Sequence, residues 1–307
     1  MAPSDPAMSE PWDRRPLLVV ALVLFAAAAT VAWAAVGPTP PAARPDGATV
    51  LPTTDDGVLD LAGSGSNLPS MRLLARRFSD ATGIPVRVHA SIGSSGGLAA
   101  LRARVVDAAL VSRPLRPNER AEGFEAIPYA LTPVVVAVHR TVPLRSLDAA
   151  ALADLIAGRV TTWPDGTPVV FVQREPGDSS FEILAKAHPE VAEADARARR
   201  AHLHPVAVHD ADVWPILGEM PGAIAIVAEG DLRHHPDVRP VTFEGKRPTV
   251  AAVVTGRYPY RKSLALVLPP DAPEALRRLA AFVTSDEART LLREAGYAPP
   301  LPTPPAP

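Results

Sequence analysis

Residues 58–69 read VLDLAGSGSNLP, an apolar, strand-like run that ends in glycine, serine and asparagine just before a helix is expected to begin. Two later stretches repeat this design, SIGSSGG at 91–97 and REPGDSS at 174–180. A helix N-terminus presents unpaired backbone N–H groups and the positive end of the helix dipole, and glycine lets a ligand approach the backbone. Three such loops predict a pocket built for a small oxyanion.

Strands and helices are expected to alternate around these loops. The hydrophobic pattern predicts strands over residues 58–62, 86–89, 107–111, 133–138, 169–172, 206–208, 223–227, 239–243 and 264–268. It predicts helices over residues 69–82, 98–104, 147–157 (with Ser146 as N-cap), 181–187, 272–284 and 287–294. This alternation is typical of α/β layers with mostly parallel sheets, whose ligands bind beyond the carboxyl ends of the strands. All three loops lie at such ends.

The composition limits the class of protein. At 307 residues and 47% hydrophobic content the chain can bury a large core, and its length favours two lobes. A formal net charge of -2 and 5% aromatic residues give no basic surface of the kind that binds nucleic acid. The absence of cysteine excludes disulfides, thiolate metal sites, a cysteine nucleophile and a lipid-bearing cysteine.

An uncharged apolar run, residues 17–36, follows Arg14 and Arg15. As a helix it would be about 30 Å long, enough to cross a bilayer, with the arginines and the rest of residues 1–16 on the cytoplasmic side. It is therefore either a transmembrane anchor or a signal peptide cleaved near the A-x-A arrangement of residues 32–34. Both alternatives place the remaining chain outside the cytoplasm.

The composition of two segments predicts that they do not fold. Residues 37–57 are rich in proline, alanine and threonine, and residues 299–307 repeat this character. Such segments cannot bury enough apolar surface to fold and tend to be extended. We therefore expect a linker that separates the domain from the membrane, and a disordered tail.

The series of motifs resembles the PstS-like, phosphate-binding members of the type 2 periplasmic binding-protein superfamily. The resemblance covers roughly residues 58–297. Besides the three loops it is carried, in order, by DAALVSRPL at 107–115, IPYA at 127–130, LIAG at 155–158 with Thr162-Trp163, and GRYPY at 256–260.

The resemblance implies two α/β lobes joined by hinge strands, with the ligand held between them and hinge closure as the conformational step. Lobe 1 would be discontinuous, residues 58–138 plus 244–298, and lobe 2 would be residues 139–243. The implied function is that of an exported, monomeric binding protein that captures phosphate or a related oxyanion for an ABC transporter. No catalysis, cofactor or metal is expected.

The resemblance also implies the ligand-binding residues. The first two loops would contribute backbone N–H groups and side-chain hydroxyls or amides, and Arg174 could make two parallel charged hydrogen bonds to one oxyanion. A cation after a cleft-edge strand, Arg113, is added from its position in the sequence. The expected site residues are Ser66, Asn67, Ser94, Ser95, Arg113, Arg174, Asp178, Ser179 and Ser180.

One departure from the family pattern bears on the identity of the ligand. Phosphate binders commonly carry an aspartate, which accepts the ligand's proton, where this chain has Ser112-Arg113. Asp178 stands in a loop where the family often has serine, so it is either a relocated proton acceptor or only the N-cap of the following helix. If it is only a cap, the ligand could be sulfate or another oxyanion.

The sequence also contains features of a serine hydrolase, of a metal site and of a membrane-bound sensor. Residues 93–97 match the G-x-S-x-G motif of serine hydrolases, with Ser95 as nucleophile and Asp210 with His234 or His235 as partners. His202, His204 and His209 beside Asp210 suggest a metal site only weakly. If residues 17–36 stay as an anchor, a membrane-bound sensory or regulatory role becomes the alternative to transport.

Overall fold

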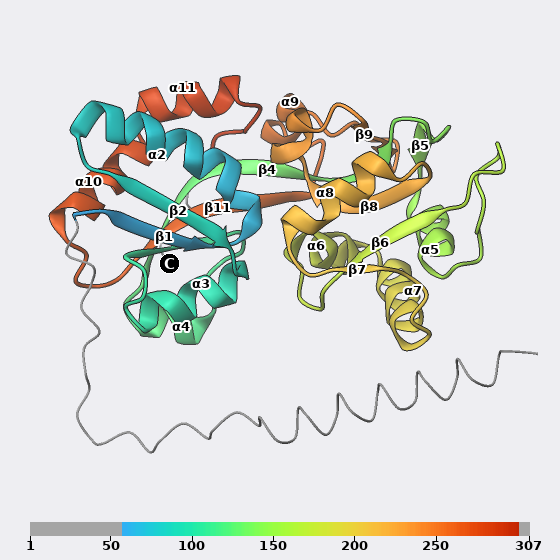
Figure 1. Ribbon diagram of the computed structural model, residues 1–307, viewed down its shortest axis with the longest axis horizontal. Helices are drawn as coiled ribbons and strands as arrows, with labels where there is room; N and C mark the ends of the chain where they lie inside the picture. The colour runs from blue at the N-terminus through green and yellow to red at the C-terminus, as the bar shows by residue number, and fades with distance from the viewer. Residues whose placement is uncertain (1–56, 301–307) are drawn as a thin grey trace, which may run out of the picture. The chain divides into compact units, whose positions relative to one another are not determined.

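The computed structural model describes residues 57–300 (Figure 1). The expected leader at 17–36, nearly all of the linker and most of the tail lie outside the described residues. Within residues 57–300, no helix has both the length and the apolar character needed to span a membrane.

The first lobe is built on three parallel strands, β1 (Leu59–Gly63), β2 (Val86–Ser91) and β3 (Ala108–Val111). Helix α2 (Leu68–Thr82) follows β1; it has proline in its first turn and ends at Gly83, which adopts the left-handed conformation (φ 72°). The limits expected for this helix are confirmed within one residue.

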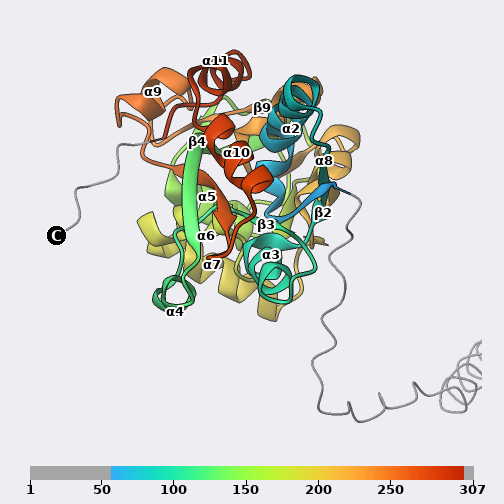
Figure 2. The ribbon, with the colours of Figure 1, turned by 90° about the vertical axis from the view of Figure 1, so that its left-hand side faces the viewer.

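Helices cover both faces of this first-lobe sheet. Figures 1 and 2 place α2, α10 (Glu274–Val283) and α11 (Asp286–Glu294) over one face, and α3 (Gly93–Arg102) and α4 (Pro117–Ala121) on the other. Buried leucines from both sides pack against β1 and β3 and form two clusters.

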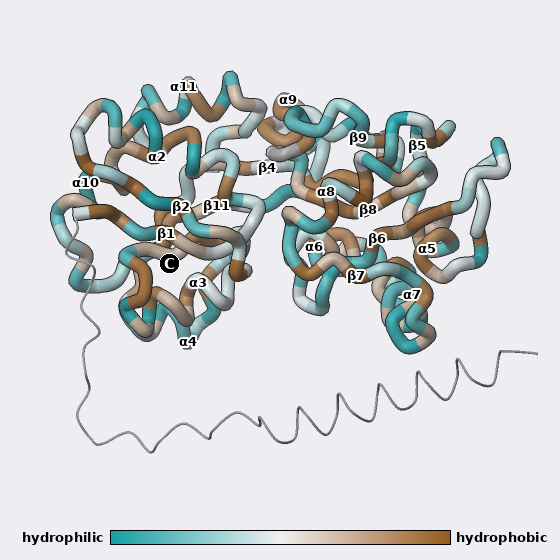
Figure 3. Tube along the Cα trace, viewed as in Figure 1, coloured by the Kyte–Doolittle hydropathy of each residue, from teal (hydrophilic) through white to brown (hydrophobic). Residues whose placement is uncertain are grey.

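The second lobe repeats the design with the parallel strands β6 (Val170–Arg174), β7 (Val206–Ala207) and β8 (Ala223–Ala228). Helix α8 (Asp210–Glu219) packs on one face of this sheet. The core on the other face includes residues of α5 (Ala149–Ile156), α6 (Ser179–Ala187), α7 (Pro189–Arg200) and α9 (Val250–Val254). Strands β6 and β8 are apolar over most of their length (Figure 3).

The remaining elements are short. They are the 3₁₀ helices η1 (Gly65–Asn67) and η2 (Glu229–His234), and the strands β5 (Ser146–Leu147), β9 (Val238–Pro240) and β10 (Thr242–Phe243). Strand β5 pairs with β10, and β9 pairs with β4.

Two antiparallel strands, β4 (Glu125–His139) and β11 (Arg261–Leu268), join the halves. Strand β4 pairs with β11 through its first half and with β8 through Val134–Val138. Among the described residues this gives one mixed sheet in the order β2-β1-β3-β11-β4-β8-β6-β7, with β9 also paired to β4. The expected two-lobe α/β fold is confirmed; the crossing strands make its sheet mixed.

The buried clusters bear on where the lobes meet. Val134, Val136 and Val138 of β4 pack with Phe171 and Ile224, as do Val253, Tyr258 and Tyr260. The division into residues 58–138 plus 244–298 and 139–243 stays a proposal. On these contacts we would move the second half of β4 and residues 250–260 to the second lobe.

Three local predictions need correction. Helix α5 is capped by Asp148, whose side chain accepts a hydrogen bond from the Ala151 N–H at 2.8 Å, while Ser146 belongs to strand β5. Strand β4 begins at Glu125 rather than at residue 133, because its prolines occupy positions that the sheet tolerates. Helix α8 was not predicted, since Pro215 interrupts its pattern.

Candidate functional site

The three glycine and serine loops line one pocket of about 440 Å³ between the two halves of the fold. Each loop follows the carboxyl end of its strand, β1, β2 or β6, as expected. Six of the nine predicted site residues line this pocket: Ser94, Ser95, Arg113, Arg174, Asp178 and Ser179. We call this space the anion pocket.

Close backbone packing shapes the first-lobe wall of the anion pocket. A Cβ atom on Gly97 would lie 2.7 Å from the Gly63 Cα atom, so the start of α3 can approach the end of β1 this closely because residue 97 is glycine. This approach keeps the first turn of α3, with Ser94 and Ser95, at the pocket.

Hydroxyl groups connect this wall to the opposite lobe. The Ser64 and Ser112 Oγ atoms are 2.8 Å apart, and the Ser112 N–H donates to Ser94 Oγ at 3.1 Å. Ser112 Oγ also lies 3.1 Å from Ser179 Oγ, at the start of α6. The Ser64–Ser112–Ser179 chain therefore crosses the cleft, and the two lobes touch here.

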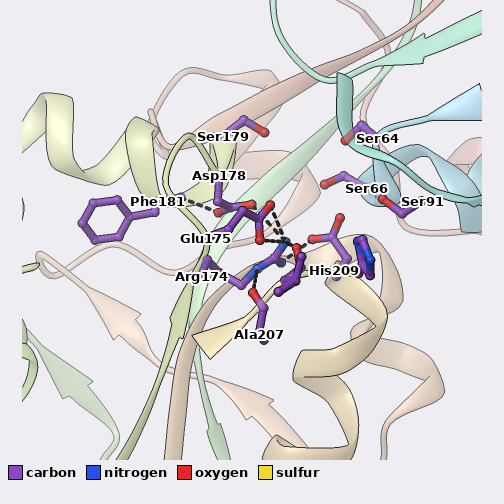
Figure 4. A network of polar contacts seen from close by, with 12 residues as sticks. Ser64, Ser66, Ser91, Arg174, Glu175, Asp178, Ser179, Phe181, Ala207 and His209 are labelled. Carbon is purple, nitrogen blue, oxygen red and sulfur yellow. Dashed lines mark hydrogen bonds and ion pairs between the residues drawn. The ribbon is translucent and has the colours of Figure 1, made fainter. Parts of the chain in front are cut away.

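The second-lobe wall is centred on Arg174, whose side chain is buried among acceptors (Figure 4). Its Nε donates to the Ala207 carbonyl at 3.1 Å, its Nη1 donates to Asp210 Oδ1 at 2.8 Å, and its Nη2 lies 3.2 Å from a Glu175 carboxylate oxygen. Burial disfavours the charged guanidinium, but Asp178, Asp210 and Glu175 outweigh burial and raise the Arg174 pKa. Arg174 is thus a fixed cation.

A second layer of side chains holds the Arg174 backbone. Gln173 donates to Asp195 Oδ1 at 2.6 Å, and Asp195 Oδ2 accepts from Arg199 Nε at 2.6 Å. Arg199 Nη2 then donates to the Arg174 carbonyl at 2.6 Å. Helix α7 therefore orients the end of β6 without reaching the anion pocket itself.

Asp178 caps helix α6. Its Oδ1 accepts from the Phe181 N–H at 2.9 Å, and its Oδ2 lies 3.5 Å from Arg174 Nη2 (Figure 4). One oxygen is therefore used by the cap while the other faces the guanidinium. The capping interaction is present, and it leaves the second oxygen available at the pocket.

Arg113 is not a free cation. Both of its Nη atoms donate to Glu119 at 2.8 Å, and Nη2 also lies 3.2 Å from Ser95 Oγ. The hydrogen bond from Arg113 lowers the Glu119 pKa to about 2. Arg113 lines the anion pocket as half of an ion pair, so its charge is largely compensated there.

The other three predicted residues do not line the anion pocket. Ser66 Oγ accepts from Lys262 Nζ at 2.8 Å, and Asn67 Oδ1 accepts from Tyr129 OH at 2.8 Å inside the first-lobe core. Ser180 is buried, and among the described residues no group hydrogen-bonds its Oγ. The structure therefore does not bring Ser66, Asn67 or Ser180 to the lining of the anion pocket.

The structure adds four residues to the predicted ones: Ser64 and Ser112, which lie inside the quoted motifs, and Asp210 and Lys262, which lie outside them. Asp210, the first residue of α8, meets the first lobe at Gly65, where an added Cβ would lie 2.1 Å from Asp210 Oδ2. Burial would raise the Asp210 pKa, but Lys262 and Arg174 hold it below its usual value. In the sequence, only the presence of a carboxylate at position 210 indicated that Asp210 could belong to a site.

The Gly65–Asp210 contact separates the anion pocket from a larger chamber of about 710 Å³. Both spaces are lined by Gly65, Ser91, His209 and Asp210, but the larger one adds apolar groups such as Leu68 and Pro215. Arg174 and the 174–180 loop do not line it. Oxyanion donors therefore converge on the smaller space.

The lining of the anion pocket does not carry an excess of positive charge. Three arginines, Arg113, Arg116 and Arg174, face four carboxylates, Glu175, Asp178, Glu182 and Asp210. Long-range attraction of anions is therefore weak, and recognition depends on local hydrogen bonds in a partly desolvated pocket.

The metal and hydrolase alternatives gain no geometric support in residues 57–300. No group of three histidine or acidic side chains there could hold a metal ion, and His204 instead contacts the Ile156 carbonyl. Ser95 accepts from Arg113, and no described histidine hydrogen-bonds its hydroxyl. His235 stacks on Trp214, with ring centroids 4.4 Å apart.

Comparisons with known proteins agree with this architecture. A family model described as a PBP superfamily domain matches residues 48–287. The phosphate-binding protein PstS 2 of Streptococcus pneumoniae is 32% identical over 108 residues, which cover 35% of this chain and 36% of that protein. The match therefore spans about a third of the relative's length.

Solved structures of similar fold cover most of the chain. A candidate phosphate ABC transporter substrate-binding protein from Clostridium perfringens, with bound phosphate, has a TM-score of 0.69 at 19% identity and covers 80% of this chain and 100% of that one. An ABC-type phosphate transport receptor from Vibrio cholerae has a TM-score of 0.58 at 20% identity and covers 79% and 100%.

Proposed function

Because the chain belongs to the PBP superfamily, we propose that it is an extracytoplasmic solute-binding protein that captures phosphate between its two lobes. The observation that carries this proposal is the convergence of three helix-start loops and the buried Arg174 on one pocket. Backbone N–H groups, serine hydroxyls and a guanidinium are the donors that oxyanions need.

Each wall of the pocket would make a separate contribution. Ser94, Ser95 and the first turn of α3 would donate neutral hydrogen bonds, and Arg174 would supply the charged ones. Asp178, with one oxygen free of the cap, would accept a hydrogen bond from a protonated oxygen of the ligand. Such an acceptor favours hydrogen phosphate over sulfate, which carries no proton near neutral pH.

Binding rather than catalysis is the proposed role, with an ABC transporter as the partner. The C. perfringens and V. cholerae proteins of similar fold carry that description. Residues 17–36 would direct export and either remain as an anchor or be cleaved. The mass of the mature protein distinguishes these two fates.

Calorimetric titration of the purified protein, stripped of ligand, tests the proposal. Phosphate should bind with measurable heat, and sulfate should bind more weakly at matched ionic strength. Equal or tighter sulfate binding would contradict the phosphate assignment while keeping an oxyanion site. No heat with either anion would contradict the proposed function as a whole.

A further inference from the structure

Asp210 is a half-buried carboxylate in the cleft that the loop motifs do not include. It begins helix α8, and its Oδ1 accepts from Arg174 Nη1 at 2.8 Å while its side chain meets Gly65 of the opposite lobe. It lines both the anion pocket and the larger chamber. A ligand that reaches Arg174 must therefore also meet Asp210.

The charge state of Asp210 decides what it can offer a ligand. Lys262 and Arg174 attract it strongly enough to overcome burial and keep its pKa low, so it is ionised near neutral pH. An ionised carboxylate only accepts hydrogen bonds. It therefore favours a ligand oxygen that carries a proton and repels one that does not.

Several charged groups surround Asp210 and bear on its pH dependence. They are Arg174 and Glu175 at the end of β6, Asp178 at the start of α6, Lys262 on β11, His209 and Asp212 on either side of it, and Arg72 on α2 across the larger chamber.

The balance of charge around the Arg174 guanidinium decides which form of the ligand is favoured. Asp178 and Asp210 both face it with side chains exposed by only 5% and 18%, while Glu175 is more exposed at 36%. One buried cation thus has a buried carboxylate, Asp178, and a half-buried one, Asp210, beside it. An oxyanion without protons would add repulsion there, whereas one with two hydroxyl groups can donate to both carboxylates.

We propose that Asp210 is a second specificity-determining acceptor alongside Asp178, and that the pocket selects a singly charged oxyanion with two hydroxyl groups, dihydrogen phosphate. This inference rests on the proposed phosphate-binding function. It differs from that function in naming the protonation state of the ligand and the residue on α8 that selects it.

The pH profile of the unmodified protein provides the first test. As pH rises from 6 to 8, phosphate loses its second hydroxyl, so the apparent affinity for total phosphate should fall by roughly tenfold as the competent species becomes scarce. Sulfate does not change its protonation over this range, so its weak binding reports any titration of the protein itself.

The second test compares Asp210→Asn with Glu219→Gln, a matched substitution of an exposed carboxylate at the opposite end of α8. An asparagine at 210 can donate to an unprotonated oxygen. Asp210→Asn should therefore weaken phosphate binding at pH 6 by about 10- to 100-fold, flatten the pH profile and tighten sulfate binding. Glu219→Gln should retain the profile. Thermal melts identify any variant that fails to fold.

Each other outcome contradicts the inference. Tighter phosphate binding by Asp210→Asn would make Asp210 an internal competitor of the ligand, and unchanged binding would make it a structural partner of Arg174 only. An affinity of the unmodified protein that rises with pH would point to the doubly charged ligand, even if a variant misfolds. If the unmodified protein binds neither anion, the proposed function fails together with this inference.

Discussion

The two walls of the anion pocket are built from different chemistry. The first-lobe wall presents mainly serine hydroxyls and glycine-flanked backbone; of the two arginines that line it, the half-buried Arg113 is compensated by Glu119 and Arg116 is exposed. The second-lobe wall presents Arg174 amid carboxylates. A wall of neutral donors accepts any oxyanion of the right size, while fixed charges distinguish one oxyanion from another. We therefore assign capture to the first lobe and selection to the second.

Removing Arg174 should have the largest effect on phosphate binding, because it removes the cation of the second-lobe wall. Arg174→Ala removes the guanidinium that faces the buried Asp178 and the half-buried Asp210, so phosphate affinity should fall by about 100-fold or more in calorimetric titration. Arg174→Lys keeps the charge but loses the fork geometry, and it should recover only part of that loss. Arg197→Ala, an exposed arginine on α7, is the control. Unchanged affinity in Arg174→Ala would remove the charged wall from the binding site.

A methyl group at the contact between the walls should have the next largest effect. Gly65→Ala would place Cβ 2.1 Å from Asp210 Oδ2, so the loop or the carboxylate must move. We expect phosphate affinity to fall by about tenfold, since overpacking costs about 1–3 kcal/mol. Gly218→Ala on α8, where a Cβ meets nothing within 4 Å, is the matched control. Equal titration curves for the two variants would contradict a fixed Gly65–Asp210 contact.

The hydroxyl chain across the cleft should contribute less. Ser112→Ala and Ser179→Ala should each weaken phosphate binding by about three- to tenfold, as expected for single neutral hydrogen bonds. Their double variant should lose less than the sum of the single losses, because the two hydroxyls interact with each other. Strict additivity of the calorimetric free energies would show that the contact does not form in the bound state.

The smallest effect on ligand affinity is expected from the Arg113–Glu119 ion pair of the first-lobe wall. Glu119→Gln leaves Arg113 uncompensated, so phosphate and sulfate should both bind about two- to threefold more tightly and selectivity should not improve. Asp271→Asn, which breaks an exposed ion pair with Arg104 far from the pocket, serves as control. Weaker binding by Glu119→Gln would mean that Glu119 positions Arg113 rather than screening it.

The same pair makes stability depend on pH. The Glu119 pKa is lowered from 4.5 to about 2 in the folded protein. Its contribution is therefore complete above pH 4.5 and is lost as pH falls from there through 2. The melting temperature of the unmodified protein should approach that of Glu119→Gln over this range. A constant difference between them would contradict the depressed pKa.

Much of the fold was predictable because its signals are local. Pro69 and Gly83 mark the ends of α2, and each glycine and serine loop follows a strand whose apolar run is evident. Strand β4 was only half recognised, because its first half contains Pro128 and reads as a loop. Pro215 hid helix α8 in the same way.

The site was predictable only where the loops carry it. Ser94, Arg174 and Ser179 were predicted from their motifs. Ser112 lies in the DAALVSRPL motif but was not predicted as a site residue, because its role depends on contacts with the distant Ser64 and Ser179, and that of Asp210 depends on Arg174. Asn67 also shows the limit of a motif, because long-range packing against Tyr129 turns its side chain into the core. Spacing along the chain identifies the loops, whereas side-chain direction depends on the opposing lobe.

Lys262 gives the crossing strands a mechanical consequence. It lies on β11, pairs through its backbone with Thr132 of β4, and holds Ser66 through its buried ammonium group. Bending of β11 would move the Lys262 ammonium group and so displace the 63–67 loop, which this group contacts through Ser66. The angle between the two lobes and the position of the 63–67 loop would therefore change together. A spectroscopic label beside Ser66 would report that angle with no ligand present.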